Sequence, residues 1–142
     1  MILKIFTVLC ILFFPEIHFD NTNISPDFII LLILFSLNDF SVSIIILSSF
    51  LIGFIRDSLT QINLFGINTF LLGVLGYLFL VFNGIKNNII KCFSIFVLLF
   101  IYHFCFFYAT ISNDFLSIII LTFLKTFSTY VVFLFSIKIN HR

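Results

Sequence analysis

The chain has 142 residues, of which 62% are hydrophobic, and its 7 basic and 6 acidic side chains give a formal net charge of +1. So few charged side chains cannot cover a soluble domain with a hydrated surface, and the near-neutral balance excludes a nucleic-acid partner. This is the composition of an integral membrane protein. The apolar runs lack the two-residue alternation of barrel strands, so we expect an all-α protein.

Apolar runs separated by short polar breaks predict six transmembrane helices that form one domain over residues 1–142. The first run follows Lys4, and because no small-residue cleavage site comes after it, we expect a retained helix and not a signal peptide. The predicted spans are 2–14, 26–37, 41–55, 67–82, 89–109 and 115–137.

The second and third runs are each shorter than the roughly 20 residues that cross a 30 Å hydrocarbon core. Residues 26–55 therefore form either one long tilted helix or two short ones. Two helices are favoured because Asn38 and Asp39 are turn formers. Six spans with a cytoplasmic amino terminus also leave only Arg56 outside and agree with the positive-inside rule. The basic residues then predicted to be cytoplasmic, together with both termini, are Lys4, Lys86, Lys91, Lys138 and Arg142.

Polar residues mark the predicted helix starts at the outer membrane face. Ser25 is expected to be the N-cap of the second helix, with Pro26 at its first position and Asp27 near the positive end of the helix dipole. Asn113 and Asp114 precede the last helix in the same way. We expect these acids to cap helices.

The segment from Arg56 to Asn68 is predicted to form a rigid outer hinge between the third and fourth helices. The opposite charges of Arg56 and Asp57 lower the cost of ending a helix near hydrocarbon. Gly66 permits a sharp turn, and Asn68 is expected to accept hydrogen bonds from free amides in the next helix. The polar surface of the hinge is a candidate contact for a partner.

Small residues predict close packing of the third and fourth helices. Ser49 and Gly53 lie on one helix face, and Thr69, Gly73 and Gly76 lie on the other helix. In lipid, close backbone approach is a main source of helix association. We therefore expect these two neighbours to pack tightly.

Lys125 lies about ten residues inside the last span, where an unpaired ammonium is costly. We expect it to face the bundle interior with Asp57 as counter-ion, or Asp114 as the second choice. The alternative is that its side chain extends to the membrane surface. The polar residues on the same helix face are Thr122, Thr126 and Thr129.

The sequence predicts no enzyme activity, cofactor or metal. His103 has no second ligand at a suitable spacing, so a hydrogen-bonded packing histidine is favoured over a proton relay or a metal ligand. The cysteines lie in apolar runs without pairing or metal spacing. The chain has no motif for a nucleophilic serine, an intramembrane aspartyl protease, a phosphate loop or a zinc hydrolase.

Several motifs, in this order, resemble the family of rod shape-determining proteins called MreD. They are Pro26-Asp27 followed by FIILLILF, Gly53-x-x-x-Asp57, and Phe65-Gly66-Ile67-Asn68 followed at residues 71–77 by LLGVLGY. The structural or partner-contact candidates are Pro26, Asp27, Gly53, Arg56, Asp57, Gly66, Asn68, Gly73 and Lys125.

The resemblance implies a scaffold of the bacterial cytoplasmic membrane that acts with an MreC-like bitopic protein, an MreB-like filament and wall-synthesis enzymes in lateral peptidoglycan synthesis. It also implies a six-helix fold similar to the S-component of energy-coupling-factor vitamin transporters. The alternative function is therefore a small-molecule-binding transporter subunit. Against this alternative, residues 5–12 are bulky where those subunits have an Ala-x-x-x-Ala face, and the chain has no Trp.

Overall fold

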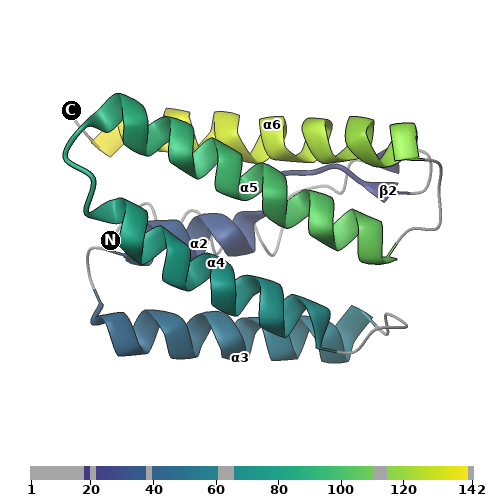
Figure 1. Cartoon of the computed structure of the whole chain (residues 1–142), viewed down its shortest axis with the longest axis horizontal. Coiled ribbons are helices and arrows are strands. Elements are labelled where there is room, and N and C mark those ends of the chain that lie inside the picture. The colour runs from purple at the N-terminus through teal and green to yellow at the C-terminus, as the bar shows by residue number, and fades with distance from the viewer. Residues whose placement is uncertain (1–17, 20–21, 38–39, 61–65, 111–114, 141–142) are drawn as a thin grey trace.

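The computed structural model describes residues 18–19, 22–37, 40–60, 66–110 and 115–140, which form five helices and a small β-hairpin (Figure 1). Strand β1 (His18–Phe19) pairs antiparallel with β2 (Thr22–Asn23). The sequence predicted helices only, so this hairpin is a correction. The helices are α2 (Phe28–Ser36), α3 (Val42–Thr60), α4 (Ile67–Asn83), α5 (Asn88–Thr110) and α6 (Phe115–Asn140).

Three of the described helices are long and apolar enough to cross a membrane. These stretches are 42–59 in α3, 88–110 in α5 and 115–135 in α6, whereas α4 is apolar but shorter. Residues 26–55 hold two separate helices, as predicted, although α3 continues past its expected end to Thr60. The predicted first span, 2–14, lies outside the described residues.

Helices α3 and α4 pack against each other through small residues, as the sequence predicted. A Cβ atom placed on Gly53 would lie 2.5 Å from Cα of Thr69, so the two backbones are nearly in contact. Gly73 faces the ring of Phe50, where an added Cβ would lie 2.6 Å from the nearest ring carbon. The glycines thus permit an approach that larger residues would prevent.

Helix α2 lies in the middle of the bundle and contacts α3, α4 and α6. Its residues Ile30 and Leu31 are fully buried. They belong to a core that also contains Leu72 of α4 and Leu99 of α5. A nine-residue helix gains little from its own hydrogen bonds, so this burial accounts for its stability.

The two ends of the bundle differ in charge. Figure 1 places the turn between α4 and α5 at the same end as the carboxyl end of α6. Lys86 and Lys91 therefore lie near that end, whereas Arg56 and Asp57 lie at the opposite end, where α3 finishes and α4 begins.

Candidate functional site

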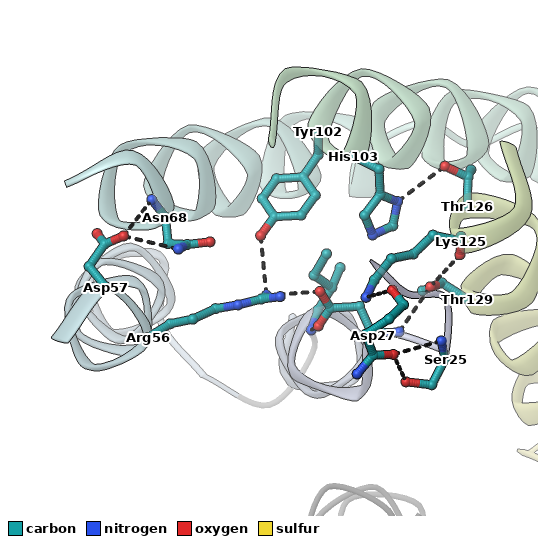
Figure 2. A network of polar contacts seen from close by, with 12 residues as sticks. Ser25, Asp27, Arg56, Asp57, Asn68, Tyr102, His103, Lys125, Thr126 and Thr129 are labelled. Atoms are coloured by element: carbon teal, nitrogen blue, oxygen red, sulfur yellow. Dashed lines mark hydrogen bonds and ion pairs between the residues drawn. The ribbon is translucent and has the colours of Figure 1, made fainter. Parts of the chain in front are cut away.

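The site is a buried polar centre, formed by Asp27, Arg56, Tyr102, His103 and Lys125 from four helices or their ends (Figure 2). Its core is an ion pair in which Nη1 of Arg56 lies 2.8 Å from Oδ2 of Asp27. The same Nη1 atom donates to the Tyr102 hydroxyl at 3.3 Å. The ion pair therefore joins the start of α2 to the end of α3 and to the middle of α5.

The ion pair corrects the prediction that Arg56 and Asp57 neutralise each other. Neighbouring residues of a helix point about 100° apart, so these two side chains leave α3 on different faces. Arg56 extends to Asp27, and its guanidinium lies over the Phe106 ring at 5.4 Å from the centroid. Asp57 extends instead to the start of α4.

Asp57 caps α4 from outside that helix. Its Oδ1 accepts hydrogen bonds from the backbone and side-chain amides of Asn68, both at 3.0 Å. Its Oδ2 accepts from the backbone amide of Thr69 at 2.8 Å and from its hydroxyl at 2.6 Å. Asn68 thus donates to a cap and does not provide one, which corrects its predicted role. Gly66 has φ of 99°, in agreement with the predicted sharp turn.

Helix α6 provides hydrogen-bond partners for the extended segment 23–27, which precedes α2. The Lys125 ammonium donates to the Asn23 carbonyl at 2.9 Å, and the Ser128 hydroxyl donates to the Ile24 carbonyl at 3.1 Å. The Asp27 amide donates to the Thr129 hydroxyl at 3.0 Å. In a membrane interior, backbone N–H and C=O groups outside helices find no water to bond to. The side chains of α6 supply these hydrogen bonds to segment 23–27.

The prediction that the polar face of α6 is directed inward is confirmed. Thr122, Thr126 and Thr129 are fully buried, and Lys125 is 6% exposed, so its side chain does not extend to the membrane surface. The predicted Asp57 counter-ion is wrong, because the Asp57 carboxylate is bonded to α4. Figure 2 shows Lys125 and Arg56 approaching Asp27 from opposite sides, and both positive charges act on its carboxylate. The second candidate, Asp114, lies outside the described residues.

Asp27 was predicted to lie at the outer membrane face, but it lies inside the bundle and is 5% exposed. Its partner Thr129 lies about 21 Å along α6 from Phe115, counted at 1.5 Å per residue. Helix α2 begins at Phe28 and its N-cap is Asp27, whose Oδ1 accepts from the Ile30 amide at 3.4 Å. Ser25 and Pro26 precede this cap in the extended segment.

His103 is fully buried, and its Nδ1 lies 3.1 Å from the Thr126 hydroxyl. This is the hydrogen-bonded packing role that the sequence favoured. Among the described residues, no group of three or more His, Cys, Asp or Glu side chains is placed to hold a metal ion. The candidates Gly53 and Gly73 lie at the α3–α4 interface, apart from the polar centre.

Sequence reasoning missed Tyr102, Asn23 and Ser128 as members of this network. Tyr102 lies in a phenylalanine-rich run that has no polar periodicity. Asn23 contributes its backbone carbonyl, which every residue type has, so the sequence could not identify it. Only the inclusion of Ser128 could have been predicted from the sequence, because Ser128 lies one helical turn after Lys125 on α6.

A family model described as rod shape-determining protein MreD matches residues 1–140. No curated protein and no solved structure matches the chain. The match extends far beyond the residues whose motifs suggested the family, and it includes every helix of the polar centre. The chain therefore belongs to the MreD family of rod shape-determining membrane proteins.

Proposed function

We propose that the protein is a non-enzymatic scaffold of the rod complex in the bacterial cytoplasmic membrane. In this role it assembles with an MreC-like bitopic protein, an MreB-like filament and wall-synthesis enzymes for lateral peptidoglycan synthesis. Membership of the MreD family supports a shape-determining role. The specific partners are part of the proposal.

The observation that carries the scaffold role is the fixed pairing of α3 and α4. Asp57 makes four hydrogen bonds to the first turn of α4, and Gly53 brings the two backbones together. The pair is therefore held at its outer end and along its length. A pair fixed in this way presents its outer surface in one geometry, which suits a docking partner.

The outward surface of α3 is mostly apolar. Large exposed side chains on it include Leu47, Leu51, Phe54 and Leu59, with exposed fractions between 52% and 78%. In a membrane this surface contacts lipid or a neighbouring transmembrane helix. We assign it to the bitopic partner, because it is continuous with the outer end that Asp57 fixes.

We further propose six membrane spans, cytoplasmic termini and a fold similar to that of transporter S-components. The basic residues at one end of the bundle support the orientation, and three described helices are long and apolar enough to supply spans. A reporter fused after Arg142 should be cytoplasmic, and cysteines at positions 86 and 91 should be labelled from the cytoplasmic side. Labelling of these cysteines only from the outer side would overturn the topology.

The partner assignment is tested by co-purification with the MreC-like protein. Asp57→Ala removes the acceptor of four hydrogen bonds at the α4 start, so recovery of the partner should fall severalfold while membrane insertion is kept. Thr110→Ala is the control, because Thr110 lies at the end of α5, away from the α3 surface, and its hydroxyl bonds to the Phe106 carbonyl of its own helix. Gly66→Leu is a second variant of the same end, since its φ of 99° disfavours a side chain.

Full recovery of the MreC-like protein with both Asp57→Ala and Gly66→Leu would contradict a role for the outer end in assembly. Recovery of transporter ATPases in its place would overturn the scaffold function. It would favour the small-molecule-binding alternative.

A further inference from the structure

Two polar side-chain atoms of the bundle are buried without a hydrogen-bond partner in the described part of the chain. They are Oδ1 of Asn68 and Nε2 of His103, and both residues are fully buried. An unsatisfied buried polar atom costs about 1–3 kcal/mol, so two of them in one bundle call for a physical explanation.

Both atoms point toward the same ion pair. Figure 2 shows the Asn68 side-chain oxygen directed toward the Tyr102 hydroxyl and the Arg56 guanidinium. Asn68 bonds to Asp57, and the adjacent Arg56 bonds to the Tyr102 hydroxyl, so the α4 start lies beside the contact between Arg56 and Tyr102. The Asn68 atom therefore faces the polar centre from the α4 side.

The second atom faces the polar centre from the other side. The other ring nitrogen of His103 contacts Thr126, which fixes the orientation of the imidazole. Figure 2 shows Nε2 turned toward the space where Lys125 approaches Asp27. The charges of Asp27 and Lys125 both act on the imidazole. The two atoms without partners thus flank the Asp27–Arg56 pair.

We propose that the polar centre binds internal water at two positions. One water donates to Oδ1 of Asn68 and accepts from Tyr102 or Arg56. The other joins Nε2 of His103 to the Asp27 carboxylate. A buried water molecule needs two to four polar partners, and each position provides them. Water both donates and accepts, so it satisfies either tautomer of the histidine.

Hydration also suits the depth of the site. Non-helical backbone and ionised side chains are tolerated at membrane depth where they are buried in protein or meet water. The segment 23–27 lies against α6 and the Asp27–Arg56 pair lies between α2 and α3, so both are enclosed by helices of the bundle. Bound water completes the partners of the charged groups without opening the bundle.

Radiolytic labelling of the full-length protein in nanodiscs tests this proposal, because a short X-ray pulse converts bound water into hydroxyl radicals that oxidise adjacent side chains. Rates are normalised to those of the same residues in the unfolded chain. Tyr102 and His103 should be oxidised about ten times faster than equally buried aromatic residues that lack a polar neighbour. Phe79 of the apolar core is the control, at 1% exposure against 3% for Tyr102 and 0% for His103.

A radical scavenger in the bulk solution separates bound water from solvent access. Labelling of Tyr102 and His103 should persist with the scavenger, whereas labelling of exposed Tyr108 should disappear. In Asn68→Leu, labelling of Tyr102 should fall to the rate of Phe79 while that of His103 is kept. Rates no higher than that of Phe79, or full suppression by the scavenger, would overturn the proposal.

Discussion

The α3–α4 pair and the polar centre join helices by opposite means. The pair contains neighbours in sequence, and its close contacts are the Thr69 backbone against Gly53 and the Phe50 ring against Gly73. The polar centre joins segments far apart in the chain, through the Asp27–Arg56 ion pair and the bonds from Lys125 and Thr129 to residues 23–27. The pair relies on shape along its length and on hydrogen bonds to Asp57 only at one end, whereas the polar centre relies on charge and hydrogen bonding throughout.

In a membrane, no hydrophobic driving force brings helices together. The difference shows that one kind of contact can hold helices together while another kind defines their arrangement. Small residues give dispersion energy wherever two helices approach closely, but their pattern is common and defines a partner weakly. A buried ion pair is satisfied by one arrangement only, because each charge needs its own partner. We infer that glycine packing holds the hairpin together and that the polar centre fixes how α2, α5 and α6 join it.

The largest expected effect comes from breaking the ion pair on one side. Asp27→Leu removes the carboxylate 2.8 Å from Arg56 while the guanidinium stays mostly buried, with a side-chain exposure of 17%. Removing one partner of a buried pair costs about 3–5 kcal/mol. The free energy of unfolding, measured by titration with SDS in mixed micelles, should fall by this amount.

The double variant Asp27→Leu with Arg56→Met is the control for this experiment. It lacks the same N-cap but no longer leaves the Arg56 guanidinium buried without its carboxylate, so it should be more stable than Asp27→Leu alone. Equal stability of the two variants would mean that the ion pair is not what Asp27 contributes.

A smaller effect is expected at the glycine interface. Gly53→Ala places a methyl group 2.5 Å from the Thr69 backbone, which cannot move aside as a side-chain tip can. Overpacking of this kind costs about 1–3 kcal/mol. Gly84→Ala is the control, because its nearest neighbour would be 3.5 Å away and the residue is exposed. Unfolding in SDS should separate the two variants, and equal stability would contradict close backbone packing.

The smallest effect is expected at the bond between α6 and the extended segment. Thr129→Val keeps the shape of the side chain but leaves the Asp27 amide without its acceptor, at a cost of about 1 kcal/mol. Amide hydrogen exchange at Ile24, Ser25 and Asp27 should speed up. Thr122→Val is a closely matched control, because Thr122 is equally buried and its hydroxyl bonds to Ile118 of its own helix. The idea fails if both variants exchange alike.

Sequence reasoning succeeded where a signal lies within one helix. The apolar runs predicted the described helices, and the spacing of Thr122, Thr126 and Thr129 predicted the inward face of α6. It failed to predict which side chains from different helices bond to each other. Lys125 and Asp57 were paired by charge alone, but Asp57 is already saturated by α4 and Lys125 bonds to a backbone carbonyl. Residue types cannot reveal such an acceptor.

The depth of Asp27 was missed for a related reason. Ser25, Pro26 and Asp27 resemble a helix start at a membrane surface, and a helix start does follow them. Their position depends on α6, which lies about a hundred residues later and accepts the Asp27 amide through Thr129. Local residue preferences describe the ends of a helix, whereas its height in the bilayer is a property of the assembled bundle.

The tie between residues 23–27 and α6 has a consequence for biogenesis. The acceptors and donors for this segment are synthesised last among the described helices, at sequence separations of 102 to 104 residues. Until α6 has been synthesised, the polar backbone groups of this segment bond to water, lipid headgroups or the insertion machinery. Docking of residues 23–27 against the bundle therefore follows the synthesis of α6, and ribosome-stalled chains that stop before α6 should expose this segment to proteases.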